Sequence, residues 1–395
     1  MSVPDEVLSL FKLDWPRDPS LLAERRKAMG VQHYVAEIAA WCAEINAQLD
    51  ELAADRGMPL VLMGGNAAAL RLDVAMQRGS ADNDYLTSAS EQDIAGLMDA
   101  FAERFAAAPE PYFRPEPVPK PEGAEELPLR AYKIRVPRIS DRNPRADENL
   151  VVKVEFHLDP ELPPHERVSS EMWAVPEPVH ANVPLLPFQV GLKLLTLVRP
   201  PVGIDPARED SIPRQIYDVD VLLAQMVVPG NWKDLAAYGR RRHDRELRQR
   251  ELPDEDGQPS RDVIDRLDEW SACRDRTSRY WSLINAMQSA QLKRQSQRLP
   301  EEWAARCRRL SVAMRCLERV EPYVPWERII KIERRIPTNP QGAELRTLRR
   351  AITQVANGVP QTTRLRSMYW EWVGSAPDID AALERAEAIA AALPT

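Results

Sequence analysis

Residues 58–86 constrain the fold more than any other part of the chain. The stretch begins with a short apolar run, MPLVLM at 58–63, which is typical of a buried strand. Gly64 and Gly65 follow, and residues 66–78 have the composition of a helix. A second short strand then ends the stretch. The sequence therefore predicts strand, glycine turn, helix and strand in one local unit.

The second strand, expected at 82–86, carries two carboxylates, Asp82 and Asp84. Residues two apart on a strand point to the same face, so both can bind one divalent cation while Asn83 turns away. Nucleotidyl transfer from an NTP needs such a cation, because it neutralises charge on the transferred phosphorus centre and on the leaving pyrophosphate. Mg²⁺ and Mn²⁺ prefer oxygen ligands. Glu155, central in an apolar strand expected at 150–158, is the candidate third carboxylate.

The glycine pair suits a phosphate-binding turn. Without side chains at Gly64 and Gly65, backbone amides and a helix N-terminus can approach phosphate oxygens. A glycine pair alone more often serves an ordinary turn, and a lone Asp-x-Asp is usually a solvated loop feature. Their joint placement, with Arg78 and Ser80 just before Asp82, favours a nucleotide site that takes an NTP as substrate.

The string GGNAAALRLDVAMQRGSADNDYL at 64–86 resembles the first motif of the AbiEii-type nucleotidyltransferase toxins of type IV toxin–antitoxin systems, within the DNA polymerase beta superfamily. In that family a GG[ST]-like turn precedes a helix and an R-x-S-x-D-[ILF]-D segment. Asn66 stands where Thr or Ser is usual, and Asn83 replaces the usual apolar middle residue. The resemblance implies metal binding by Asp82, Asp84 and Glu155. It implies nucleotide contacts for Gly64, Gly65, Asn66, Arg78 and Ser80.

Two downstream segments also resemble this family. LKLLTLVRP places Lys193 in the role of its helix-borne lysine, and RQIYDVDVLL places Arg214 and Asp218 in its R-x-x-x-D segment. Lys193 would hold the triphosphate as a point charge; the alternative is a lysine that snorkels at a helix edge. Asp218, taken with Lys193 as catalytic, would hold Lys193 or a nucleotide. Asp220 is expected to be an ordinary exposed helical acid.

The pattern of elements predicts an α+β fold, with a mixed sheet flanked by helices and then a helical domain. The expected boundaries are an N-terminal extension at 1–33, a nucleotidyltransferase domain at 34–230 and an Arg-rich helical domain at 231–395. The expected helices are 34–55, 66–78, 91–107 with Ser88 or Ser90 as N-cap, 188–200 and 214–226. Strands are expected at 129–139 and 150–158, joined by a hairpin-like connection, and an exposed loop at 108–128.

Charge is unevenly distributed along the chain. The net charge is −7, but residues 1–230 sum to −13 and residues 231–395 sum to +6. Within the second part, residues 271–370 alone carry +12. A basic half favours a polyanion partner, although arginine-rich helices are often simply solvated faces. The expected RNA-binding face consists of Arg274, Arg276, Arg279, Lys293, Arg294, Arg298, Arg306, Arg308 and Arg309 with Tyr280, Trp281 and Trp303.

Cysteine and hydropathy patterns exclude several classes. The four cysteines are widely spaced with no CxxC, and the five histidines are scattered, which argues against zinc and disulfide frameworks. No stretch approaches the roughly 18–20 apolar residues of a membrane span. The N-terminus has acidic residues where a signal peptide has a basic start. We therefore expect a cytoplasmic protein without a membrane partner.

These features together predict metal-dependent transfer of NMP from an NTP to a hydroxyl acceptor. The resemblance implies that the acceptor is tRNA or another RNA, and that the protein is the toxin of a toxin–antitoxin or phage-defence pair with a separate antitoxin protein. Two alternatives stay open. One is a small-molecule, antibiotic-type nucleotidyltransferase. The other is a non-catalytic nucleotide-binding interaction protein that keeps the fold without turnover.

Overall fold

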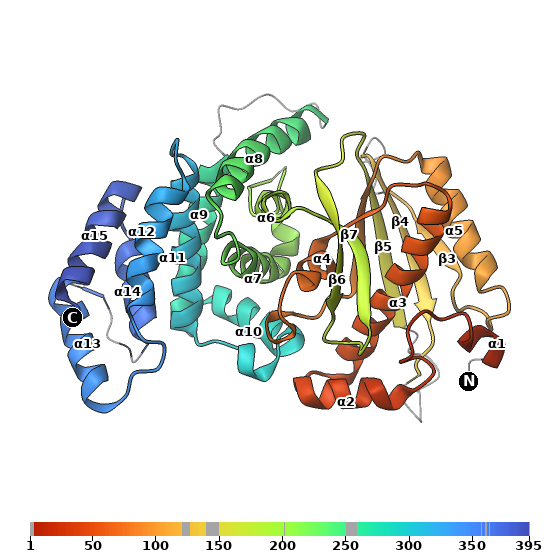
Figure 1. Cartoon of the computed structure of the whole chain (residues 1–395), viewed down its shortest axis with the longest axis horizontal. Coiled ribbons are helices and arrows are strands. Elements are labelled where there is room, and N and C mark those ends of the chain that lie inside the picture. Colours follow the sequence, from red (N-terminus) through yellow and green to blue (C-terminus); the bar gives the residue numbers. More distant parts are fainter. Residues whose placement is uncertain are drawn as a thin grey trace. The chain divides into compact units, whose positions relative to one another are not determined.

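The computed structural model describes residues 4–120, 127–139, 150–200, 202–249, 259–356, 358–359, 362 and 364–394. The chain forms two compact units (Figure 1). Unit 1 comprises Met1–Leu185 and Gln288–Gln297, and unit 2 comprises Leu186–Met287 and Arg298–Thr395.

Unit 1 contains a five-stranded mixed sheet in the order β1-β2-β5-β4-β3, which confirms the α+β class. β2 and β5 pair in parallel, and the other neighbours are antiparallel. A separate antiparallel hairpin, β6–β7, was not predicted from the sequence. The strands are β1 (Val61–Met63), β2 (Asp82–Thr87), β3 (Pro115–Val118), β4 (Leu129–Val136), β5 (Leu150–Leu158), β6 (His165–Glu171) and β7 (Pro178–Pro184).

Helix α3 (His33–Asp55) holds these sheets together, because it contacts both β5 and β7. Its apolar residues recur at helical spacing, and Trp41 is fully buried against Trp15, with ring centroids 4.8 Å apart. Phe11 packs on Trp41 as well. Phe11 and Trp15, which lie within residues 1–33, therefore belong to the hydrophobic core of unit 1. The other helices of unit 1 are α1 (Asp5–Leu8), α2 (Pro19–Met29), α4 (Gly64–Leu70), η1 (Val74–Met76), α5 (Glu91–Arg104) and η4 (Arg294–Ser296).

A local sequence signal predicted the start of one helix, α5, correctly. Ser90 is the N-cap of α5 and forms a capping box with Asp93, as the sequence indicated for Ser90. The helix expected over 66–78 is wrong in its second half, because it ends at Leu70. The Gln77 side chain there donates to the Leu72 carbonyl at 2.9 Å, which stabilises a loop instead.

The loop expected at 108–128 is also wrong in part, since β3 lies within it. Among the described strands, β3 pairs with β4 alone, and prolines are tolerated on such an edge strand because one side of it needs no donors. The strands at 129–139 and 150–158 are confirmed as an antiparallel pair. Their expected connection at 140–149 lies outside the described residues.

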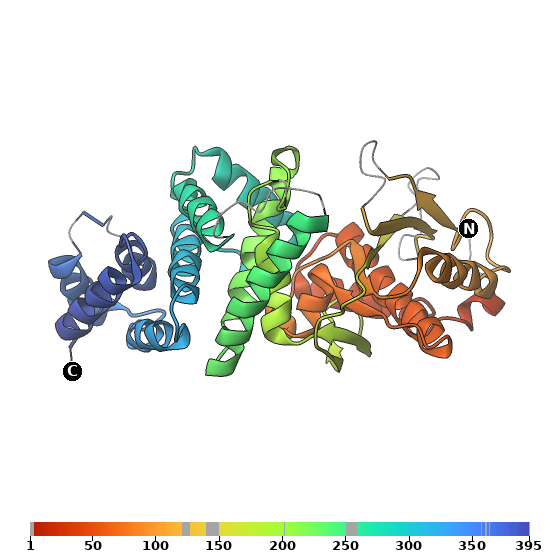
Figure 2. The ribbon, with the colours of Figure 1, turned by 90° about the horizontal axis from the view of Figure 1, so that it is seen from above.

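Unit 2 consists of helices in its described residues, as two views show (Figure 1, Figure 2). They are α6 (Leu186–Leu195), η2 (Pro206–Ser211), α7 (Ile212–Leu223), α8 (Pro229–Gln249), α9 (Pro259–Trp270), η3 (Ser271–Arg274), α11 (Pro300–Leu317), α12 (Tyr323–Arg334), α13 (Gly342–Val355), α14 (Leu365–Gly374) and α15 (Ile379–Ala392). α10 (Arg279–Gln291) starts in unit 2, and its last residues belong to unit 1.

The compact units do not coincide with the domain boundaries expected at 33/34 and 230/231. α6 and α7 group with the C-terminal helices because α6 packs on α8 and α7 packs on α11. In the described part of the chain, every helix is too short or too polar to cross a lipid bilayer.

Candidate active site

The glycine turn lies directly against the Asp84 carboxylate. β1 ends at Met63, which is the register partner of Asp84 on β2, so Gly64 starts α4 beside that residue. Gly64 has φ +70°, and a Cβ placed on it would overlap the Asp84 side chain, with Oδ2 as the nearest atom. Only glycine combines this backbone conformation with the available space.

Gly65 approaches the next pair of predicted residues. A Cβ on Gly65 would lie 2.7 Å from Nη2 of Arg78 and 2.7 Å from Oγ of Ser80. Ser80 Oγ in turn donates to Asp82 Oδ1 at 2.9 Å. The structure therefore brings Gly64, Gly65 and the predicted Arg78-x-Ser80-x-Asp82-x-Asp84 side chains to one place. A buried guanidinium and the first turn of α4 meet there, which suits a phosphate group.

The two departures from the family pattern compensate each other. Asn66 Nδ2 donates to Asn83 Oδ1 at 2.7 Å and to the Asp82 carbonyl at 2.9 Å. Asn83 is fully buried, and its own Nδ2 donates to the Cys42 carbonyl at 2.9 Å. Asn83 thus turns away from the carboxylates, as predicted, and its polar atoms are satisfied. This network fixes α4 to β2 and identifies Asn66 as a structural partner of the strand.

The parallel pairing of β2 with β5 brings Glu155 beside Asp84. Asp84 pairs in register with Glu155, and Asp82 with Lys153, so these four side chains share one face of the sheet. Lys153 Nζ lies 2.6 Å from Glu155 Oε1. Sequence analysis missed Lys153, although its i, i+2 spacing from Glu155 was the available signal.

The oxygen donors fit a magnesium–nucleotide site better than a preformed all-protein metal cage. Within the described ranges, no group of three or more His, Cys, Asp or Glu side chains is arranged to hold a metal ion. Mg²⁺ usually takes one or two carboxylates and completes its shell with water and substrate phosphates. Asp82 and Asp84, two half-buried carboxylates beside a glycine turn, meet that requirement.

Cys42 lies behind these carboxylates and stays a thiol. Burial raises the pKa of Cys42 well above its ordinary value, and the negative charge of Asp82 raises it further. A protonated thiol is a poor nucleophile and metal ligand. Cys42 therefore contributes packing and a backbone carbonyl rather than chemistry.

A segment distant in sequence anchors the loop that carries Arg78. Gly79 N donates to the Gln291 carbonyl at 2.9 Å, and Ser296 Oγ donates to the Ala75 carbonyl at 2.9 Å. The Gln291 side chain also accepts from Arg78 Nη1 at 3.3 Å. Gln288–Gln297 therefore supports the site from within unit 1.

Lys193 and Asp218, both in unit 2, form a buried ion pair. Lys193 Nζ lies 2.7 Å from Asp218 Oδ2, and the two side chains are 6% and 1% exposed. Gln215 Oε1 accepts from the same ammonium at 3.1 Å. The sequence suggested two partners for Asp218, Lys193 and a nucleotide, and the structure shows Lys193. The lysine does not snorkel, because its charge is held inside the unit.

The prediction that Asp220 is an exposed acid is wrong. Asp220 is 4% exposed and pairs with Arg306, whose Nε lies 2.7 Å away, and with Arg309. Burial opposes its ionisation, but the charges of Arg309 and Arg306 outweigh burial and lower the pKa of Asp220. Helical periodicity alone could not show that an arginine-rich helix packs over this acid.

The same contacts correct much of the expected RNA-binding face. Trp303 is fully buried, and Lys293 is 2% exposed. Further arginines of that face are held by acids of unit 2: Arg274 by Glu371, Arg279 by Glu209 and Glu269, and Arg308 by Asp268. The exposed arginines without an ion pair among the described residues of unit 2 are Arg208, Arg240, Arg241, Arg248, Arg261, Arg276, Arg334, Arg335, Arg346 and Arg350.

The mixed sheet, glycine turn and paired carboxylates are features of a nucleotidyltransferase. The family model described as "Nucleotidyl transferase AbiEii toxin, Type IV TA system" matches residues 49–309. The chain belongs to this family. A crystal structure of an inferred nucleotidyltransferase from H. pylori aligns at 14% identity with a TM-score of 0.37, covering 70% of this chain and 94% of that one. No curated protein matches the chain.

Proposed function

We propose that this nucleotidyltransferase moves NMP from an NTP to a hydroxyl group of an RNA, as the toxin of a type IV toxin–antitoxin pair with a separate antitoxin. The observation that carries the proposal is the packing of the Gly64–Gly65 turn against Asp84, Arg78 and Ser80. Phosphate binding and a metal-binding carboxylate then meet at one point, as transfer from an NTP requires.

In the proposed reaction, the acceptor oxygen attacks the α-phosphorus, the bond from that phosphorus to the bridging oxygen breaks, and pyrophosphate leaves. A divalent cation, Mg²⁺ or Mn²⁺, would be held by Asp82 and Asp84 and would neutralise charge developing on the phosphate oxygens. Arg78 and the first turn of α4 orient the phosphates. Glu155 receives the proton of the attacking hydroxyl once its carboxylate releases Lys153.

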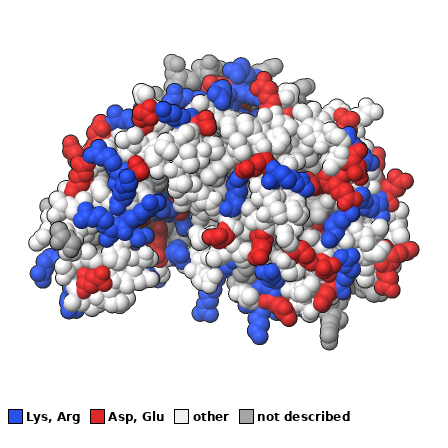
Figure 3. Space-filling model, in the orientation of Figure 1, with Lys and Arg blue, Asp and Glu red and all other residues white. Residues whose placement is uncertain are grey.

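RNA is the favoured acceptor because unit 2 offers exposed cations. Lys and Arg side chains gather on its face seen in Figure 3. Arg276, Arg346 and Arg350 are among those with no ion pair in the described part of the chain. Such groups bind phosphodiesters, and the affinity then falls steeply with salt because counterions are released. Of these three arginines, Arg276 belongs to the face that the sequence selected, whereas Arg346 and Arg350 do not.

The test is incorporation of each radiolabelled NTP into total cellular RNA, with an aminoglycoside as a second acceptor. We expect metal-dependent labelling of RNA that Asp82→Asn or Asp84→Asn reduces at least about a hundredfold, because an amide cannot replace a metal-binding carboxylate. Asp73→Asn is the matched control, since Asp73 is an exposed acid of the same segment.

Three outcomes would contradict the proposal. Labelling of the aminoglycoside but not of RNA would favour the small-molecule enzyme. No labelling with any NTP would favour the non-catalytic nucleotide-binding protein. Equal labelling by Asp82→Asn and Asp73→Asn would show that the Asp82 carboxylate takes no part in the transfer reaction.

A further inference from the structure

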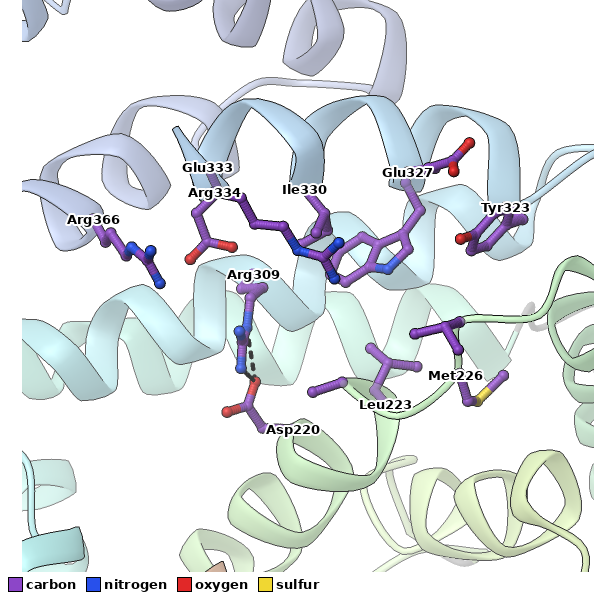
Figure 4. A pocket seen from close by; sticks show the side chains of 13 residues that line it. Asp220, Leu223, Met226, Arg309, Tyr323, Glu327, Ile330, Glu333, Arg334 and Arg366 are labelled. Carbon is purple, nitrogen blue, oxygen red and sulfur yellow. Dashed lines mark hydrogen bonds and ion pairs between the residues drawn. The ribbon is translucent and has the colours of Figure 1, made fainter. Parts of the chain in front are cut away.

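A cavity in unit 2 is lined by residues from the end of α7 and from α11, α12 and α14. Its volume is about 270 Å³. That is near the lower limit, roughly 300 Å³, of pockets that hold small ligands, so it suits one compact group. Figure 4 shows Arg334, Glu327 and Ile330 on α12, and Arg309 extending from α11 towards Asp220.

One part of the cavity wall is apolar and aromatic. Leu223, Met226 and Ile330 line it together with Tyr323 and Trp326. The Trp326 indole is held by neighbouring rings, with centroids 5.2 Å from Trp232 and 6.1 Å from Trp370. Trp326 is only 6% exposed, so it backs the cavity, and the half-buried Tyr323 ring is the aromatic surface against which a nucleobase can stack.

The acids that line the cavity already have partners. Asp220 pairs with Arg306 and Arg309, Glu327 lies 3.1 Å from Lys331, and Glu333 accepts from Trp370 Nε1 at 2.9 Å. The three carboxylates are therefore engaged by donors of the protein itself. Asp220 and Glu327 are paired with cations, whereas the hydrogen bond from a neutral indole leaves Glu333 its charge. Among the described residues, the cavity's other two cations form no ion pair with these acids.

Those other cations are Arg334 and Arg366. Arg334 is exposed and makes no hydrogen bond or ion pair within the described ranges. Arg366 uses Nε to donate to the Ile336 carbonyl at 2.8 Å, and its Nη groups have no protein acceptor among the residues described. Two guanidinium groups with unused donors are suited to bidentate binding of a phosphate.

We propose that this cavity binds a nucleoside phosphate, with the base against Tyr323 and the phosphate on Arg334 and Arg366. It is a second nucleotide site, built from none of the residues around the glycine turn, and it does not depend on the proposed transfer reaction. The ligand is either a free mononucleotide or an unpaired nucleotide of an RNA strand, which present the same chemistry.

The test measures binding to the full chain carrying Asp82→Asn and Asp84→Asn, in EDTA, so that the metal-dependent site does not contribute. The probes are 5′-AMP, ribose 5-phosphate and a short fluorescent oligoadenylate RNA. Arg334→Glu is compared with Arg335→Glu, which changes the net charge equally at an exposed neighbour that does not line the cavity. Circular dichroism and thermal unfolding verify that both variants fold.

We expect Arg334→Glu to weaken binding of AMP, RNA or both at least about tenfold, and Arg335→Glu to change it less than about twofold. Competition of AMP with the RNA identifies a free mononucleotide as sufficient, whereas binding of RNA alone identifies the strand as the source. Equal losses in both variants would reduce the effect to general charge and overturn the proposal. Ribose 5-phosphate binding as tightly as AMP would remove the role of the aromatic wall and also overturn it.

Failure of this proposal is separable from failure of the proposed function. Arg334-dependent nucleotide binding without any label transfer would reject only the transfer reaction. Metal-dependent transfer in the wild-type chain, with no Arg334-dependent binding, would reject only the second site.

Discussion

Replacing Gly64 with alanine tests whether the turn positions the Asp84 carboxylate. Gly64 has φ +70°, and its Cβ would overlap that carboxylate. The left-handed conformation costs an L-residue about 1–2 kcal/mol, and pushing a side chain off its rotamer adds about 0.5–1.5 kcal/mol. We therefore expect the free energy of unfolding to fall by about 1.5–3.5 kcal/mol in total. Because the carboxylate must move, transfer should fall nearly as far as in Asp84→Asn.

Gly57→Ala supplies the matched control. Gly57 has φ +62°, and a Cβ on it would meet nothing within 4 Å. It should lose about 1–2 kcal/mol of stability from backbone strain alone and keep its transfer rate. Urea unfolding followed by circular dichroism gives the stabilities, and label incorporation gives the rates. If Gly64→Ala and Gly57→Ala transfer equally fast, the turn does not position Asp84.

Two further predictions concern buried charges. Asp220→Asn should lower the free energy of unfolding by about 3–5 kcal/mol, because it leaves two arginines without their buried counter-charge. Asp380→Asn is the control: Asp380 pairs with Arg319 on the surface, so its loss should cost about 1 kcal/mol or less. Equal losses of the two variants in urea unfolding would contradict this prediction. Burial lowers the pKa of Lys293 from 10.5 to about 8, so folding is penalised below pH 8 and the penalty disappears as pH rises towards 10.5. Lys293→Met should therefore stabilise the protein by up to about 3 kcal/mol at pH 7 and by much less at pH 10; the same gain at both pH values would show that the charge is not its cause.

Local sequence signals predicted those parts of the fold that depend on neighbouring residues. The apolar periodicity of α3, the capping residues of α5 and the strand–glycine–helix order of β1 and α4 are all encoded within a few positions. β3 was missed because its two prolines argue against a strand, and only its place at the sheet edge makes them tolerable.

The residues of the candidate site likewise differ in whether a local motif could reveal them. Gly64, Asp82 and Asp84 could be found because they fall within one short motif. Lys153 was missed: its i, i+2 spacing from Glu155 could be seen, but its place beside Asp82 comes from the β2–β5 register, which no local pattern states. The charge count at 271–370 was correct, but it could not separate arginines that face solvent from those that pair with acids such as Asp220.

The anchoring of the Arg78 loop by Gln291 also affects how the protein is made. These residues are 213 positions apart in the chain. At about 5–20 residues per second, a ribosome needs roughly 10–40 s to bridge that distance. Throughout that interval the growing chain carries the Asp-x-Asp strand without the anchor of the preceding loop. Nascent chains released early lack this support, so synthesis of 213 of the chain's 395 residues, about half of the protein, separates the translated motif from a completed site.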